Sequence, residues 1–166
     1  MARFRIVPER SRVTATAKSS VHPIQVRANY VTGTVEADIV DGAVQLTPSP
    51  TVTITMELDD LHAENAMYDS ELKRRIDAQR YPTITGTLTE LKDSAGKYTA
   101  RGDLNLHGKT STVDGTATLR VTENGLEASG ELDLDIRDFG LTPPRMLMLR
   151  VYPEVHVEIE LVAEPE

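Results

Sequence analysis

The stretch TITGTLTELKDSAGKYTARGDLNL, residues 83–106, alternates apolar and polar side chains on both sides of a short loop. Before the loop, Ile84, Gly86 and Leu88 share one face and threonines occupy the other. After the loop the same face carries Tyr98, Ala100, Gly102, Leu104 and Leu106. A period of two indicates β-strands with one dry and one wet face, and KDSAG supplies the connecting loop. The stretch therefore predicts an antiparallel hairpin, because strands of parallel sheets are usually covered on both faces.

The same alternation recurs along most of the chain. It covers residues 12–21, 31–39, 51–58, 113–121, 126–136 and 154–161, and RFRIV at residues 3–7 is a further candidate strand. Asp41-Gly42 and Asn124-Gly125 are pairs typical of two-residue hairpin turns. An antiparallel sheet of about eight or more strands must fold onto itself, as a sandwich or as a closed barrel.

Small residues on the dry face bear on this choice. The glycines on that face are Gly33, Gly86, Gly102, Gly115 and Gly130. They are either bends that let the sheet curl, or small inward positions that leave a lumen of ligand size. Both interpretations favour a barrel, and we predict a mainly β protein with a hollow, extended antiparallel barrel.

One segment breaks the strand pattern. Tyr68, Leu72 and Ile76 recur four residues apart, which predicts one short amphipathic helix near residues 66–79. Pro82 cannot continue a helix. A single helix between barrel strands is expected to cap one open end as a stopper, and a packing helix without a gating role is the alternative.

Length and composition narrow the class of protein. At 166 residues the chain is expected to form one domain, residues 1–166, which buries roughly 70% of its unfolded surface. A formal net charge of −8 argues against nucleic-acid binding and against purely electrostatic docking on anionic membranes. The start MARFRIVPERS has no apolar run of signal-peptide length, and no stretch is long and apolar enough for a membrane segment, so a cytoplasmic location is expected.

Residues for catalysis or metal binding do not form recognisable motifs. The four histidines occur in unrelated segments, without metal-ligand spacing, and cysteine is absent: His22, His62, His107 and His156. Nucleophile-elbow, P-loop and dinucleotide-binding motifs are also absent. We therefore expect neither an enzyme, nor a metal site, nor a cofactor.

The order of several motifs resembles the YceI-like family, a group of polyisoprenoid-binding proteins. The matching pieces are YDSELKRRIDAQRYPTITGTL, ARGDLNLHGKTSTVDGTATL and LDIRDFGLTPP, followed by VYPEVHVEIEL. Within them lie Asp69, Leu72, Tyr81-Pro82, the segment from Gly102 to Gly108 and Asp138-Phe139-Gly140, and the early Ser11-Arg12-Val13 matches the usual opening. The resemblance implies a lipocalin-like barrel that holds a long isoprenoid chain, with a helix at one end and, in some members, a homodimer.

The dry face and these motifs together predict the residues that contact such a lipid. The predicted lumen residues are Val35, Ala37, Ile54, Met56, Leu72, Ile76, Leu104, Leu106, Leu119, Leu134, Ile136 and Phe139, with Met146 and Met148 at the mouth. The leading hypothesis is a non-enzymatic carrier or store of a polyprenoid or isoprenoid-quinone-like lipid. The alternative is a filled barrel that serves as a protein-interaction module, favoured if the cavity is smaller than about 300 Å³.

Overall fold

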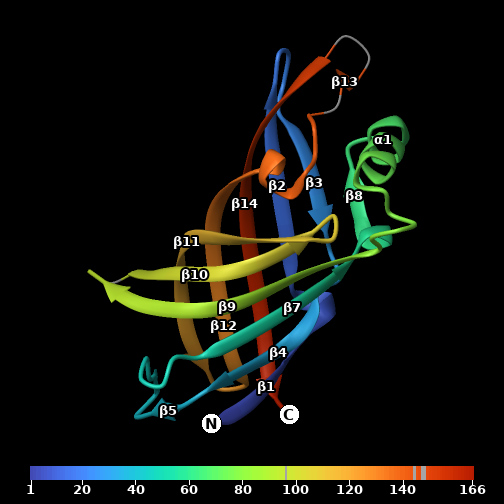
Figure 1. The fold of residues 1–166 in the computed structure, drawn as a ribbon. Helices are drawn as coiled ribbons and strands as arrows, with labels where there is room; N and C mark the ends of the chain where they lie inside the picture. The colour runs from blue at the N-terminus through green and yellow to red at the C-terminus, as the bar shows by residue number, and fades with distance from the viewer. Residues whose placement is uncertain (96, 144, 147–148) are drawn as a thin grey trace.

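The protein consists mainly of β-strands (Figure 1). A computed structural model describes residues 1–95, 97–143, 145–146 and 149–166, with the backbone alone at residues 145–146. The strands are β1 (Ala2–Ile6), β2 (Arg12–Ser19), β3 (Ile24–Ala28), β4 (Thr32–Ala37), β5 (Ile39–Val40), β6 (Ala43–Val44), β7 (Thr51–Glu57), β8 (Leu61–Ala63), β9 (Thr83–Ser94), β10 (Lys97–Leu106), β11 (Lys109–Thr122), β12 (Gly125–Asp135), β13 (Arg145–Met146) and β14 (Leu149–Pro165). The helical elements are α1 (Ala66–Ile76) and the short 3-10 turns η1 (Pro8–Arg10), η2 (Leu58–Asp60) and η3 (Ile136–Phe139).

Eight strands form a closed antiparallel barrel. Their order is β1-β4-β7-β9-β10-β11-β12-β14, and pairing of β1 with β14 closes the ring. The two chain termini consequently lie side by side at one end (Figure 1). The prediction of an extended antiparallel barrel with one short helix is confirmed.

Strand β14 holds two parts of the sheet together. One of its edges pairs with β12. Its other edge pairs first with β2 and then, towards its end, with β1. Strands β2, β3 and β8 continue the sheet beyond the closed barrel, and α1 lies beside β8 at the end opposite the termini (Figure 1). The sheet therefore forms a taller wall on one side of the barrel.

A buried serine fills the place where β14 changes partner. Pairing with β2 ends at Glu160 and pairing with β1 begins at Ala163, which leaves Leu161 and Val162 between them. The Val162 amide donates to Ser11 Oγ at 3.0 Å, and the Val7 amide donates to the Val162 carbonyl at 2.8 Å. Ser11 is 2% exposed, so its hydroxyl replaces a ladder hydrogen bond that water cannot supply.

Helix α1 has a defined cap at each end. The Asn65 side chain accepts from the Tyr68 amide at 2.9 Å, which satisfies one free donor of the first turn. The helix ends at Ile76, three residues earlier than predicted, because Asp77 adopts a left-handed conformation with φ of 56°. Among the described helices, none has the length and apolar character needed to cross a bilayer.

Two turns differ from their predicted positions. Strand β2 ends at Ser19, so Val21 lies in the turn to β3 and is 70% exposed instead of facing inward. The β11–β12 turn consists of residues 123–124, one residue earlier than predicted, and Gly125 pairs with Thr122. A Cβ at Gly125 would lie 2.1 Å from the Ala163 carbonyl oxygen, so this close strand crossing requires glycine.

Candidate functional site

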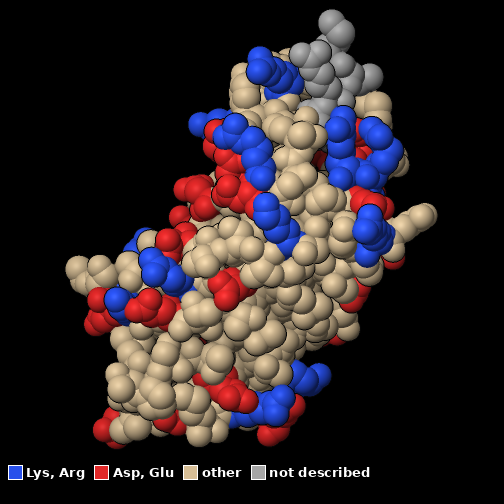
Figure 2. Space-filling view, in the orientation of Figure 1, with Lys and Arg blue, Asp and Glu red and all other residues tan. Residues whose placement is uncertain are grey.

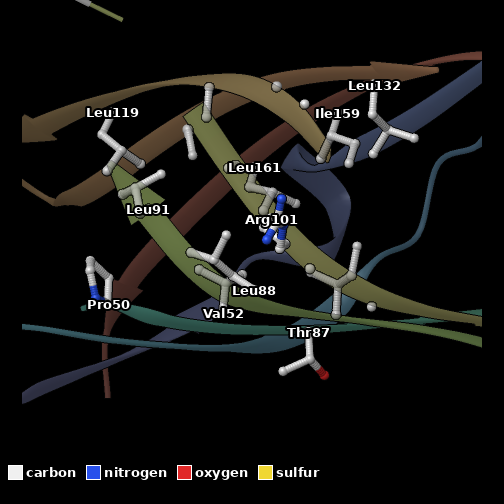
Figure 3. A pocket seen from close by; sticks show the side chains of 18 of the residues that line it. Pro50, Val52, Thr87, Leu88, Leu91, Arg101, Leu119, Leu132, Ile159 and Leu161 are labelled. Carbon is white, nitrogen blue, oxygen red and sulfur yellow. The ribbon is translucent and has the colours of Figure 1, made fainter. Parts of the chain in front are cut away.

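The closed barrel encloses an apolar cavity of about 190 Å³, here called the barrel cavity. Strands β4, β7, β9, β10, β11, β12 and β14 all contribute to its wall. Figure 3 shows Leu88, Leu91 and Val52 on one side of this space and Leu119, Leu132 and Ile159 on the other. Thr87, between inward positions, points away from it (Figure 3).

The exposure of inward side chains shows that the barrel is hollow. On β11, Val113, Ala117 and Leu119 face inward yet are only half-buried, while the outward Asp114, Thr116 and Thr118 are exposed. In a filled barrel these inward positions would be buried by side chains from the opposite wall. The part of these inward side chains that stays exposed faces the cavity.

A second apolar cavity, of about 220 Å³, lies beneath α1 and is here called the helix cavity. From α1 it is lined by Tyr68, Leu72, Arg75 and Ile76. The opposite walls come from β2, β3, β12 and β14 and from the segment after η3. The predicted apolar stripe of the helix therefore faces this cavity.

The two cavities meet at four residues that border both, here called the waist. These residues are Ile54, Leu104, Leu132 and Ile159. Beside them, a Cβ added at Gly86 would lie 3.2 Å from Ile54 Cγ1 and 3.9 Å from Leu104 Cδ1. Each cavity is smaller than the roughly 300 Å³ of a typical small-ligand pocket, and together they exceed it.

Most of the predicted lumen residues border one of these cavities. Val35, Ala37 and Leu119 border the barrel cavity, Met56, Leu72, Ile76, Leu106, Leu134 and Ile136 border the helix cavity, and Ile54 and Leu104 border both. Phe139 is 1% exposed in η3 and, within the described part of the chain, borders neither cavity. Met146 is described in its backbone only, as part of β13, and Met148 lies outside the described residues.

The prediction omitted two groups of lining residues. The waist residues Leu132 and Ile159 share the inward parity of their strands, so the alternation could have identified them. By contrast, Arg75, Thr142 and Tyr152 border the helix cavity without belonging to an alternating pattern. Only the three-dimensional arrangement places these three residues there.

Charged groups lie mostly outside the cavities. Arg101, Asp103 and Glu131 border the barrel cavity, yet their side chains are exposed, as alternation along a strand requires. Arg75 borders the helix cavity, and its Nε donates to Glu71 Oε1 at 2.9 Å. Neither cavity is bordered by a histidine among the described residues. The arrangement suits the burial of an apolar molecule better than proton transfer.

Asp69 ties α1 to β8 beside the helix cavity. Its Oδ1 accepts from the Ala63 amide at 3.1 Å and its Oδ2 from Lys73 Nζ at 2.9 Å. Burial alone would raise the pKa of Asp69, but the hydrogen bonds from Lys73 and Ala63 outweigh it, so the pKa lies below its ordinary value. The ionised carboxylate therefore stabilises the position of the helix.

A carboxylate–histidine cluster lies on the outer face of the barrel. Potential ligand atoms of Glu131, His156 and Glu158 lie within 4.8 Å of one another, and His156 Nδ1 is 2.8 Å from Asp133 Oδ1. The hydrogen bond to Asp133 raises the pKa of His156. These side chains alternate with the inward Leu132, Val157 and Ile159, so they point away from the lumen, and Glu131 is the one member of the cluster that borders the barrel cavity in the described structure.

Solved structures of low sequence identity share this fold. BcnA of Burkholderia cenocepacia superimposes with a TM-score of 0.78 at 18% identity, over 94% of this chain and 98% of its own. A polyisoprenoid binding domain from Saccharophagus degradans, implicated in plant cell wall breakdown, gives a TM-score of 0.72 at 12% identity, with both chains fully covered. The YceI protein of Campylobacter jejuni gives 0.60 at 18% identity, over 82% of this chain and 81% of its own.

Sequence comparison identifies the family. A UPF0312 protein of Photorhabdus laumondii is 32% identical over 98 residues, which are 53% of this chain and 50% of that protein, so the match spans about half the length of this relative. The YceI-like domain matches residues 4–163, nearly the whole chain. Together with the hollow barrel and its covering helix, this match shows that the chain belongs to the YceI-like family.

Proposed function

We propose that the protein binds a long-chain isoprenoid lipid, such as a polyprenol or an isoprenoid quinone, and stores or transports it without chemical change. The observation that carries the proposal is the apolar lining of two cavities that meet at the waist. The Saccharophagus domain, described as polyisoprenoid binding, has the same fold and supports this class of ligand.

The energy of burial is sufficient to bind such a ligand without polar contacts. Transfer of one five-carbon isoprene unit from water contributes at most about 4 kcal/mol, at ~0.8 kcal/mol per methylene. A few units therefore exceed the ~8 kcal/mol of micromolar binding, even after the cost of association. Side chains such as Leu104, Leu132 and Leu134 are suited to this role because they present only carbon to the ligand.

Organic extraction of the purified protein, followed by mass spectrometry, tests the proposal directly. We expect a stoichiometric isoprenoid lipid, or uptake of added polyprenol or quinone by protein that carries none. Leu104→Arg places a guanidinium at the waist and should abolish uptake, whereas Thr118→Arg, on the exposed face of β11, should not. Normal uptake by a folded Leu104→Arg variant would show that this face does not line the binding site.

A protein-interaction module without a lipid ligand is the second candidate. The size of each cavity alone, below about 300 Å³, favours it. Failure to extract or load any lipid, combined with a stable protein complex, would support this function instead. Size-exclusion chromatography with light scattering tests the predicted homodimer, and cell fractionation tests the predicted cytoplasmic location.

We further infer that the protein releases the lipid with its covalent structure unchanged. The carboxylates that border the barrel cavity have exposed side chains, so no general acid and base converge on a bound chain in the described structure. Mass spectra of a loaded lipid recorded before and after incubation with the protein should therefore be identical.

A further inference from the structure

Exposed apolar side chains gather at the end of the molecule that carries α1. Val21 in the β2–β3 turn is 70% exposed, Met67 in the first turn of α1 is 46% exposed and Tyr152 on β14 is 40% exposed. Together with the exposed Lys18 and Arg150 they are here called the rim. Of the large apolar side chains that are exposed in the described structure, half belong to this one end.

Hydrogen bonds and packing hold the rim residues close together. The Ser20 amide donates to the Arg150 carbonyl at 2.9 Å, and the Arg150 amide donates to Ser20 Oγ at 3.0 Å. This links the β2–β3 turn to the start of β14. The Tyr68 ring, beside Met67, lies 6.4 Å from the His22 ring between centroids, which brings the first turn of α1 against the same β2–β3 turn.

The charge at this end differs from the charge of the whole molecule. In Figure 2 the largest areas of Lys and Arg lie over the end that carries α1, although the protein has a net charge of −8. On α1 the carboxylates Asp69 and Glu71 are paired with Lys73, Arg74 and Arg75, which leaves an excess of one positive charge.

Two exposed cations of the rim add to this excess. Lys18 lies on β2 and Arg150 on β14. Glu64, which accepts from the Gln25 amide, offsets one of these charges. The charged residues named here thus carry two more positive than negative charges, and apolar side chains lie between the cations.

We propose that the rim docks on an anionic lipid bilayer. Cations attract the negative surface, and Val21, Met67 and Tyr152 are suited to insert at the boundary of headgroups and acyl chains, where an aromatic ring with a polar tip is favoured. Tyr152 also borders the helix cavity, so docking at the rim sets that cavity against the membrane. This role rests on the proposed function, because a carrier needs a place to exchange its lipid, whereas docking itself is measurable separately.

Vesicle co-sedimentation tests the surface. We expect wild-type protein to bind vesicles of phosphatidylcholine mixed with phosphatidylglycerol, and to bind vesicles of phosphatidylcholine alone at least about tenfold more weakly. The variant Lys18→Glu/Arg150→Glu should lose about fivefold in partitioning for each cation removed. The matched control Arg5→Glu/Lys97→Glu makes the same change in net charge away from the rim and should bind as the wild type does.

A second pair of variants tests the apolar contribution. Val21→Ser/Met67→Ser should weaken binding to mixed vesicles several-fold, whereas Val40→Ser, in the β5–β6 hairpin at the other end, should not, although Val40 is 54% exposed. Equal effects of rim and control variants, or equal binding to both kinds of vesicle, would overturn the proposal.

Uptake of polyprenol delivered from cyclodextrin, without vesicles, separates the two hypotheses. Vesicle binding without uptake would contradict the proposed lipid-binding function and would support docking at the rim. Uptake without vesicle binding would contradict docking at the rim and would support the proposed lipid-binding function.

Discussion

Replacing Gly86 with valine should divide the lumen into two separate cavities. A Cβ at this position would lie 3.2 Å from Ile54 Cγ1, 3.5 Å from Ile54 Cδ1 and 3.9 Å from Leu104 Cδ1, so the two valine methyl groups extend into the waist. A lipid chain that crosses from the helix cavity to the barrel cavity then has no path. Only the part of the chain that fits one cavity remains buried.

The loss of affinity follows from the carbon that is excluded. Each isoprene unit that leaves the lumen forfeits up to ~4 kcal/mol, an upper bound because a flexible chain in water is partly coiled and already buries part of its surface. We expect the affinity for long polyprenols to fall between about tenfold and a thousandfold, at 1.4 kcal/mol per factor of ten. Short prenols that fit one cavity should bind as before, because their contacts are unchanged.

The fold should tolerate this substitution. Glycine inside a strand is unfavourable by roughly 0.5–1 kcal/mol, and valine favours strands, so stability should be unchanged or higher unless crowding at Ile54 offsets the gain. Ala100→Val is the matched control, because Ala100 borders the barrel cavity but not the waist. Titration with prenols of graded length, by calorimetry or native mass spectrometry, measures the effect. If Gly86→Val binds the longest prenol within about twofold of the wild type, the chain does not cross the waist.

Three further changes test the structure elsewhere. Ser11→Ala leaves the buried Val162 amide without an acceptor and should lower the free energy of unfolding by about 1–3 kcal/mol in urea denaturation. His156→Gln should lower the free energy of unfolding by at most about 0.5 kcal/mol, since the His156–Asp133 pair is largely exposed. Because Asp133 raises the pKa of His156, this loss should be complete below about pH 6.5 and should vanish as the pH rises through the raised pKa. Asp69→Ala should lower the free energy of unfolding by about 1 kcal/mol above about pH 4. This difference from wild type should shrink as the pH falls through the lowered pKa of Asp69.

Two of these variants, Ser11→Ala and His156→Gln, have a control in the same protein. Ser129→Ala removes an exposed hydroxyl on β12 and should leave stability within about 0.5 kcal/mol. His22→Gln replaces an exposed histidine whose ring nitrogen lies 2.9 Å from the Pro23 carbonyl oxygen, and it should leave the free energy of unfolding within about 0.5 kcal/mol of wild type. A pH-independent cost for His156→Gln would contradict the assigned pair with Asp133.

The strands could be predicted from sequence because their evidence is local. Alternation places Leu104, Leu119 and Leu134 on the inward face whatever the partner strand, since the period of a strand is two. The stripe of Tyr68 and Ile76 likewise identified the face of α1 that lines the helix cavity. These predictions required no knowledge of the topology.

Features that depend on strand partners could not be predicted in this way. The change of partner at Val162, and the role of Ser11 in it, arise from residues 151 positions apart. The waist depends on β7, β10, β12 and β14 meeting across the barrel. Tyr152 lines the helix cavity because β14 extends past the barrel, whereas the alternation indicated only residues 154–161 as strand. Non-local pairing, rather than periodicity, decides such positions.

Pairing of the first strand with the last has a consequence for synthesis. The register Phe4 with Pro165 and Ile6 with Ala163 joins two segments of which the first leaves the ribosome long before the second. Until β14 emerges, the nascent sheet retains open edges on β1 and β12, which are prone to intermolecular pairing. Contacts of such long sequence separation also slow folding. This architecture thus leaves the unfinished chain dependent on protection from aggregation until its final strand is available.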